Sequence, residues 1–345
     1  MVLIGFYKLR ERFLKAILND TLSHAHILIG PDGIGKSLLA ETVAREILGF
    51  GDRDSVDIIR VRPEKTIITV NQVREVVLEA SLKPYEGQKK VIIFYEADRI
   101  GQEGQNALLK TIEEPMEGVF FFLLSENEMF MRDTIKSRCH LHKLMPMDAG
   151  EMKAFVEAFV PSHNAREEKR VQEETLKLSY GGKKGKVEPP RILRVNEQDK
   201  AHAISLSRGI PGRAEEILLS GGKDLGLEQV LALLLTLAHR KKQRSPEVYP
   251  VLAFVEILKE TPLESFFDDF IFGVHGVLKK KSLDEEVFLE PSLQEKMDVI
   301  SRELTFSVLE KYLEVFFDMR KYIQRGVNIH AETVLNSVLL RLAGV

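Results

Sequence analysis

Short apolar runs alternate with longer amphipathic stretches over the first 150 residues. Four of the runs are bounded by polar residues or glycine and have the length of buried strands. They are HILIG (26–30), DIIRV (57–61), VIIFYE (91–96) and VFFFLL (119–124). Near-continuous apolar strands of this kind favour a parallel sheet that is covered on both faces.

The stretches between these runs carry apolar residues at helical spacing. They are residues 36–48, 70–82 and 104–114, and the last of them stops at Pro115. A regular alternation of strands and helices is typical of α/β proteins. The pattern therefore predicts an α/β domain over residues 1–150.

Beyond residue 150 the strand pattern stops. Residues 151–220 are predicted to form a smaller helical domain with an inserted loop, SYGGKKGKVEPP, at 179–190. The three lysines of this loop, Lys183, Lys184 and Lys186, fit either a solvated surface loop or a loop that contacts DNA or a partner. From 221 to 345 apolar residues recur at helical spacing, which predicts an all-helical C-terminal domain.

Composition narrows the class of protein without identifying it. A chain of 345 residues with 44% hydrophobic and 29% charged residues suits two or three globular domains. A net charge of −3 argues against a strongly basic nucleic-acid binder. The one cysteine, Cys139, cannot form an internal disulfide, and no apolar stretch approaches the length of a membrane span. We expect a cytoplasmic protein that does not contact a membrane.

The strongest chemical signal is the stretch that follows the first predicted strand. It matches the phosphate-loop pattern G-x-x-x-x-G-K-S and opens a predicted helix, which is the context that the pattern requires. Its residues are Gly30, Pro31, Asp32, Gly33, Ile34, Gly35, Lys36 and Ser37. Backbone N–H groups and the helix N-terminus would face phosphate oxygens, and Lys36 would reach the β- and γ-phosphates. The Ser37 hydroxyl would ligate the Mg²⁺ of ATP or ADP.

A second half of a nucleotide site follows about 60 residues later, in VIIFYEADRI (91–100). An ATPase normally places a magnesium-holding aspartate directly before the glutamate that polarises the attacking water. Tyr95 occupies that position and is neutral near pH 7. Glu96 is then either a water-polarising base or only the end of a strand. We expect weak or absent hydrolysis of the chain's own ATP.

Four further features occur in a fixed order along the chain. They are GQNALLKTIEEP (104–115), the triplet Ser137-Arg138-Cys139, the turn Gly209-Ile210-Pro211-Gly212-Arg213, and the helical C-terminus. Together with the phosphate loop they resemble the clamp-loader branch of the AAA+ ATPases. Within it the pattern is most similar to the delta-prime subunits of bacterial DNA polymerase III.

The resemblance implies roles for three residues outside the phosphate loop. Arg138 would be an arginine finger that enters the ATP site of a neighbouring subunit; without the family it would be interpreted as a surface ion pair. Ser125 matches the position of the first sensor, near the γ-phosphate. Arg213 matches the second sensor, although an ordinary arginine at a helix start is the competing interpretation.

The resemblance also implies an architecture and partners. The expected fold is an AAA+ domain with a parallel five-stranded sheet, a small helical lid, and an all-helical collar that assembles into a hetero-oligomer. The partners would be gamma/tau and delta subunits, the sliding clamp and primer–template DNA. Many relatives carry a four-cysteine zinc module that this chain lacks, so no zinc is expected. The alternatives are a gamma/tau-like active motor and, from another class, a free-standing phosphate-loop kinase.

Overall fold

The computed structural model of the chain describes residues 5–51, 53–64, 67–126, 128–181, 187–221, 225–243, 247–259, 263–283, 291–324 and 330–344. The three lysines of the predicted loop, Lys183, Lys184 and Lys186, lie outside these residues. Two compact units are present: Met1–Asn196 with Ser207–Glu215, and Glu197–Leu206 with Glu216–Val345. Residues 151–196 thus group with the sheet, and the division into three domains stays a prediction.

The first unit is built on five parallel strands in the order β2-β3-β4-β1-β5. The strands are β1 (Ala25–Ile29), β2 (Ile58–Val61), β3 (Lys90–Phe94), β4 (Val119–Ser125) and β5 (His140–Lys143). The three central strands β3, β4 and β1 consist almost entirely of buried residues, as the continuous apolar runs predict. The parallel five-stranded sheet expected from the sequence is confirmed.

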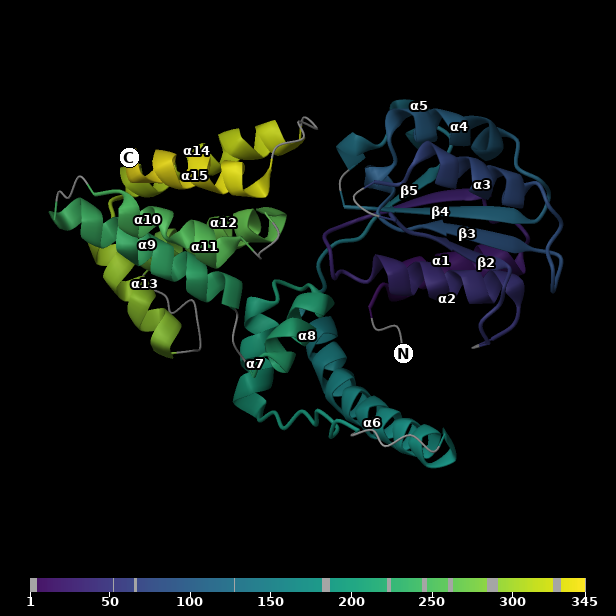
Figure 1. Cartoon of the computed structure of the whole chain (residues 1–345), viewed down its shortest axis with the longest axis horizontal. Helices are drawn as coiled ribbons and strands as arrows, with labels where there is room; N and C mark the ends of the chain where they lie inside the picture. Colours follow the sequence, from purple (N-terminus) through teal and green to yellow (C-terminus); the bar gives the residue numbers. More distant parts are fainter. Residues whose placement is uncertain are drawn as a thin grey trace. The chain divides into compact units, whose positions relative to one another are not determined.

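Helices cover both faces of this sheet (Figure 1). One face packs against α3 (Val70–Ala80), α4 (Gln102–Glu113) and α5 (Asp133–Lys136) through Ile27, Ile92, Phe94 and Phe121. The other packs against α1 (Tyr7–Leu18) and α2 (Lys36–Leu48) through Leu28, Val91, Ile93 and Phe122. Alternate residues of a strand point to opposite faces, so each central strand contributes to both apolar layers.

Local signals fix where the helices begin. Thr69 caps α3 because its hydroxyl accepts from the Gln72 backbone N–H, while the Gln72 side chain accepts from the Thr69 N–H. The helix α2 begins at Lys36, directly after Gly35, whose φ of 105° is a left-handed conformation that suits glycine. The phosphate-loop pattern therefore coincides with a strand-to-helix turn.

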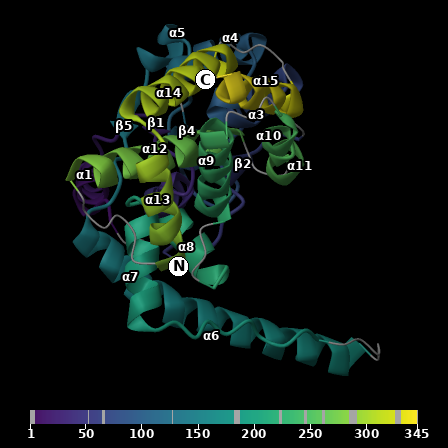
Figure 2. The ribbon, with the colours of Figure 1, turned by 90° about the vertical axis from the view of Figure 1, so that its left-hand side faces the viewer.

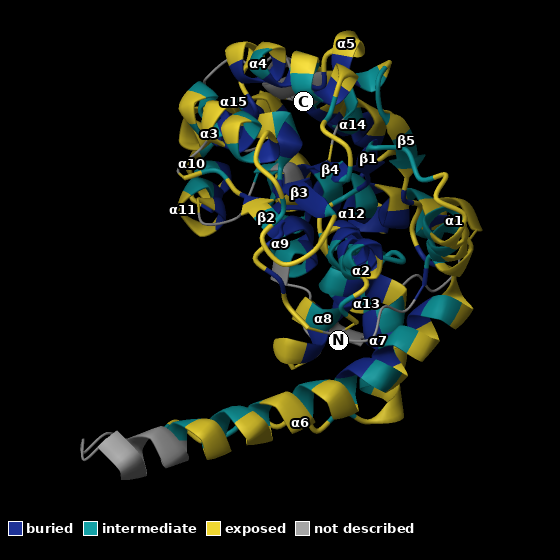
Figure 3. Cartoon of the chain, turned by 90° about the vertical axis from the view of Figure 1, so that its right-hand side faces the viewer, coloured by how far each residue is buried: buried dark blue, intermediate teal, exposed yellow. Residues whose placement is uncertain are grey.

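After the sheet, the chain forms one long helix, α6 (Ala149–Gly181), which continues through Pro161. The buried residues of α6, Met152, Val156 and Phe159, precede Pro161, whereas the described residues after Pro161 are exposed or intermediate, as Figure 3 shows. An extended segment returns along the helix, where Asn164 exchanges hydrogen bonds of 3.1 and 2.8 Å with the Leu193 backbone. The 3₁₀ turns η1 (Ala97–Arg99) and η2 (Glu128–Phe130) complete the unit's named elements up to α6.

The second unit is helical throughout its described residues. Its helices are α7 (Glu197–Leu206), α9 (Leu225–Gln243), α10 (Tyr249–Leu252), α11 (Phe254–Leu258), α12 (Leu263–Leu283), α13 (Pro291–Glu303), α14 (Phe306–Gln324) and α15 (Ala331–Gly344). The helix α8 (Pro211–Leu219) spans the boundary between the units. Helices α9, α12 and α13 pack on one another (Figure 2), and Phe270 of α12 stacks on Phe316 of α14 at 3.7 Å between ring centroids. Within the described ranges, no helix has the length and apolar character needed to span a membrane.

Candidate functional site

The phosphate loop, residues 30–37, runs from the end of β1 to the first turn of α2. Gly33 and Gly35 have φ values of 74° and 105°, which side chains with a Cβ rarely adopt. At Gly30, an added Cβ would lie 3.0 Å from the Leu144 carbonyl oxygen. The glycines of the pattern are thus needed for the curvature of the loop and for its close contact with the strand ends.

Lys36 is folded against the backbone of the loop and is only 9% exposed. Its ammonium donates to the carbonyl oxygens of Gly30, at 2.7 Å, and Pro31, at 2.9 Å. Burial lowers the pKa of Lys36, while the carboxylates of Glu126 and Asp32 act in the opposite direction. A partly desolvated positive charge therefore lies at the base of the loop.

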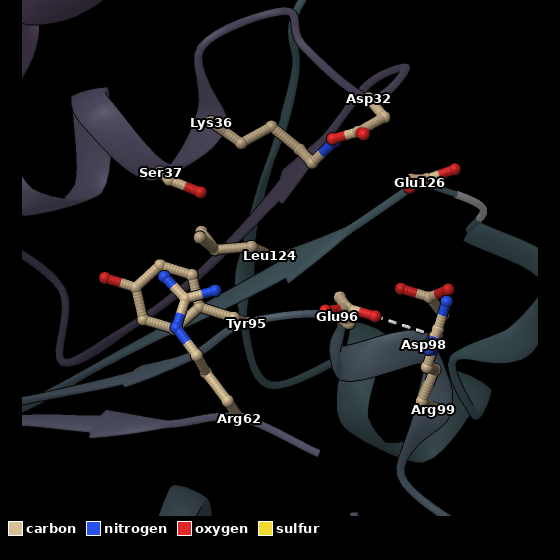
Figure 4. Close-up of a pocket in the computed structure, with 10 residues that line it drawn as sticks. All are labelled: Asp32, Lys36, Ser37, Arg62, Tyr95, Glu96, Asp98, Arg99, Leu124 and Glu126. Carbon is tan, nitrogen blue, oxygen red and sulfur yellow. Dashed lines mark ion pairs between the residues drawn. The ribbon is translucent and has the colours of Figure 1, made fainter. Parts of the chain in front are cut away.

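A cavity of about 300 Å³ opens beside this lysine (Figure 4). Its wall is formed by residues from the phosphate loop and from the carboxyl ends of β2, β3 and β4. They are Asp32, Lys36, Ser37, Arg62, Tyr95, Glu96, Asp98, Arg99, Leu124 and Glu126. The structure thus brings both halves of the predicted nucleotide site to one cavity, at the strand edge where ligands of parallel α/β sheets bind.

Tyr95 lies on this wall, but its hydroxyl is hydrogen-bonded to a residue of α2 and is not placed to bind a metal ion. The residue is 3% exposed, and its hydroxyl donates to Glu41 of α2 at 2.5 Å. Burial, together with the hydrogen bond to Glu41, raises the pKa of Tyr95 to about 12. Glu41 also accepts from Arg60 at 2.7 Å. The position of the expected aspartate is therefore held by a neutral group that is tied to α2.

Glu96, the candidate base, adopts a left-handed conformation with φ 55° and ψ 48°. Such a conformation costs a residue with a Cβ about 1–2 kcal/mol and persists only where the surroundings impose it. The Glu96 carboxylate forms an ion pair of 2.9 Å with Arg99, drawn as a dashed line in Figure 4. The carboxylate thus faces the cavity with one of its oxygens already engaged by a cation.

Ser125, the candidate first sensor, ends β4 and is fully buried. Its carbonyl oxygen accepts from the backbone N–H of Gly30 at 3.2 Å, which joins the strand to the start of the phosphate loop. The next residue, Glu126, places its carboxylate in the cavity opposite Lys36 (Figure 4). The predicted sensor position is therefore adjacent to the loop.

The turn that carries Arg213 contacts the phosphate loop directly. The Gly212 backbone N–H donates to the Gly33 carbonyl oxygen at 2.9 Å, and an added Cβ on Gly212 would lie 2.7 Å from the Gly33 Cα. A second cavity of about 250 Å³ lies here, between the loop and residues including Phe155, Pro211 and Glu215. Arg213 follows Gly212 in the chain, although among the described residues it lines neither cavity.

Arg138 lies apart from both cavities, in the turn between α5 and β5. Its guanidinium pairs with Glu113 at the end of α4 and donates to the Thr134 carbonyl oxygen at 2.8 Å. The side chain remains 34% exposed. Arg138 is therefore a surface arginine held by its own chain, and it does not line the chain's own nucleotide cavity.

Comparison with known proteins bears on the first unit. The family model described as "DNA polymerase III, delta subunit" matches residues 7–148. Over these residues, which make up less than half of the chain, the sequence is similar to that family. The delta' subunit of DNA polymerase III from Pseudomonas aeruginosa is 30% identical over 136 residues, which cover 34% of this chain and 42% of that protein.

Two further relatives match over comparable shares of the chain. The delta' subunit from Bacillus subtilis is 28% identical over 180 residues, 46% of this chain and 55% of that protein. The replication factor C small subunit from Natronomonas pharaonis is 26% identical over 145 residues, 42% of this chain and 44% of that protein. The chain spans about half the length of these curated relatives.

Four charged residues that line the first cavity were not singled out from the sequence: Arg62, Asp98, Arg99 and Glu126. Each follows directly, or within a few residues, the carboxyl end of a strand. Since the carboxyl ends of parallel strands meet at one edge, polar residues at these positions could have been predicted as neighbours. Their pairing, such as Glu96 with Arg99, could not. Among the described residues, no group of three or more His, Cys, Asp or Glu side chains is placed to hold a metal ion.

Proposed function

We propose that this chain is a delta-prime-like subunit of a bacterial clamp loader. It binds ATP or ADP at residues 30–37, turns its own nucleotide over weakly or not at all, and supplies Arg138 to the ATP site of a neighbouring subunit. The observation that carries the proposal is the combination of an intact phosphate loop with Tyr95 tied to Glu41.

Nucleotide binding is supported by the loop and by Lys36. Phosphate oxygens would replace the carbonyl oxygens of Gly30 and Pro31 as acceptors for the ammonium, and the loop N–H groups and the start of α2 would add further donors. Ser37 lines the cavity beside Lys36, at the position where the hydroxyl of an ordinary phosphate loop contacts the metal ion of the nucleotide. Ser125 and Arg213 are proposed to sense the phosphates from β4 and from the turn that contacts Gly33.

Weak turnover is supported by the residues at the magnesium-holding position, Tyr95, and at the water-polarising position, Glu96. Tyr95 is a neutral hydroxyl and cannot replace an aspartate. Glu96 would have to leave Arg99 before it could act as a base. Positioning and charge stabilisation supply nearly all of the catalysis in phosphoryl transfer, so losing both contributions leaves little.

A role for Arg138 in trans is supported by its place outside the chain's own cavity and by its exposure. In the proposed complex, the guanidinium exchanges Glu113 for the γ-phosphate of a neighbour. The relatives are named as delta', replication factor C and related subunits. The proposed partners are gamma/tau and delta subunits, the sliding clamp and primer–template DNA.

The isolated chain tests the first half of this proposal. ADP and ATP binding should be lost in Lys36→Ala, while steady-state ATP hydrolysis should be near background in both the wild type and the variant. Robust hydrolysis that Lys36→Ala abolishes would instead identify an active gamma/tau-like motor. Co-purification with gamma/tau and delta subunits tests the assembly, and phosphoryl transfer to a small molecule without partners would identify a kinase.

A further inference from the structure

We infer that Arg62 supplies the positive charge that a magnesium ion supplies at an ordinary phosphate loop, so that nucleotide binds here without a divalent cation. The ligand would be the free, metal-free nucleoside di- or triphosphate. The inference rests on the nucleotide binding proposed above and specifies which species of the nucleotide binds and which side chain compensates its charge.

The protein groups around the cavity fit a magnesium ion poorly. Magnesium prefers hard carboxylate oxygens in octahedral geometry. The residue at the usual aspartate position, Tyr95, is neutral and donates its hydroxyl to Glu41. The neighbouring carboxylate of Glu96 is paired with Arg99. Neither residue therefore offers a free carboxylate next to Ser37.

Arg62 stands where its charge could replace that of the metal. Its guanidinium carbon lies 3.7 Å from the centroid of the Tyr95 ring, and the residue lines the same cavity as Lys36 and Ser37. Figure 4 shows the guanidinium lying over the ring. A divalent cation bound beside Tyr95 would be repelled by this guanidinium, whereas a phosphate group would be attracted.

The pairing of the nearby arginines also distinguishes Arg62. Arg60 binds Glu41 and Asp54, and Arg99 binds Glu96. Within the described part of the chain, the Arg62 guanidinium has the Tyr95 ring as its neighbour but no hydrogen-bonded or ion-paired acceptor. A planar guanidinium of this kind can bind a phosphate through two parallel hydrogen bonds.

The remaining carboxylates of the cavity do not reverse this conclusion. The charges of Glu126 and Asp32, like those of Asp98 and Glu96, raise the pKa of Lys36 against the larger lowering by burial. Asp98 is different, because its Oδ1 is buried and has no hydrogen-bond partner. Asp98 is therefore the one carboxylate identified in this cavity, among the described residues, that could hold a metal instead, and the experiment must separate it from Arg62.

The test measures the Kd for ADP by isothermal titration calorimetry, in buffer with excess MgCl₂ and in buffer with excess EDTA. The wild type should give Kd values within about threefold of each other. Arg62→Ala should weaken binding in EDTA by about 10- to 100-fold, the value of a charge-assisted hydrogen-bonded contact. Asp98→Asn should have little effect in either buffer.

Arg53→Ala is the matched control. Arg53 also lies over an aromatic ring, that of Phe50 at 5.5 Å, but it pairs with Glu86 and does not line the cavity. Its removal should leave both Kd values unchanged. Circular dichroism of each variant separates loss of binding from loss of folding.

Each other outcome overturns a distinct claim. Binding that is much tighter in magnesium, and that Asp98→Asn weakens, would assign a metal site to Asp98 and exclude the role of Arg62. Metal-independent binding that Arg62→Ala and Arg53→Ala change equally would also exclude Arg62. No ADP binding in either buffer, or binding that Lys36→Ala leaves intact, would overturn the proposed nucleotide site itself and this inference with it.

Discussion

The backbone contact between the phosphate loop and the start of α8 predicts that a glycine-to-alanine substitution in this helix lowers stability, the opposite of its usual effect. Replacing glycine by alanine inside a helix normally stabilises it by up to about 1 kcal/mol. Gly212 lies in the first turn of α8, yet we expect Gly212→Ala to destabilise the first unit and to weaken nucleotide binding.

The magnitude follows from the space around Gly212. The added Cβ would lie 2.7 Å from the Gly33 Cα, 3.1 Å from its carbonyl oxygen and 3.3 Å from its carbonyl carbon. All three are backbone atoms of a loop whose Gly33 already has a φ of 74°, so no flexible side chain can yield. Overpacking of this kind costs about 1–3 kcal/mol, and separating the elements would also lose the 2.9 Å hydrogen bond from Gly212 to Gly33, worth about 1 kcal/mol.

Urea unfolding and ADP titration of Gly212→Ala measure these effects. Gly150→Ala is the control, because Gly150 is also near a helix start but an added Cβ there meets only the Asp148 side chain, at 3.2 Å. We expect Gly150→Ala to be neutral or stabilising. If Gly212→Ala is as stable as the control and binds ADP equally well, the direct contact between α8 and the phosphate loop is wrong.

Two further predictions concern buried polar groups. Tyr95→Phe should lower the free energy of unfolding by about 1–3 kcal/mol, since Glu41 loses a buried donor. The variant should leave ATP hydrolysis at background. Unchanged stability in urea unfolding would refute the hydrogen bond between Tyr95 and Glu41. The other prediction concerns His26 of β1 and His142 of β5, whose ring nitrogens Nδ1 and Nε2 lie 3.1 Å apart. Burial lowers the pKa of His26 to about 3 and that of His142 to about 4, from 6.5. Both folded-state values lie below the unfolded one, so the stability contributed by the neutral histidines is present above pH 6.5 and lost as the pH falls towards 4, with a slope from His26 of at most about 1.4 kcal/mol per pH unit. Urea unfolding between pH 7 and pH 4 should show this loss, and His26→Gln should flatten it.

The central strands and the phosphate-loop helix were predictable because their signals are local and strong. The pattern predicted helix 36–48, which is the observed span of α2, and three of the four apolar runs are the almost wholly buried central strands. The fifth strand, β5, had no such signal. Its residues His140 and Lys143 are exposed at the sheet edge, so burial on both faces does not shape its composition.

Other features could not be read from the sequence because they depend on contacts between distant residues. The hydroxyl of Tyr95 is directed by Glu41, which lies 54 positions earlier on another element. Arg62 follows β2, and the role proposed for it depends on its contact with the Tyr95 ring, which lies on another strand end. A proline inside a helix normally kinks or ends it, yet α6 continues through Pro161. Propensity at a single position is a weak signal when a long helix is supported on both sides.

The most direct test of the central claim is ATP hydrolysis by a reconstituted clamp loader that contains Arg138→Ala in this subunit. Single-turnover measurements should show hydrolysis slowed by about 10³-fold or more at the neighbouring site that Arg138 faces, the value of an arginine finger. ADP binding by the isolated variant should be unchanged, and Arg53→Ala should behave as the wild type. If the complex with Arg138→Ala hydrolyses ATP at the wild-type rate at every site, this chain does not act through its neighbour and the account is wrong.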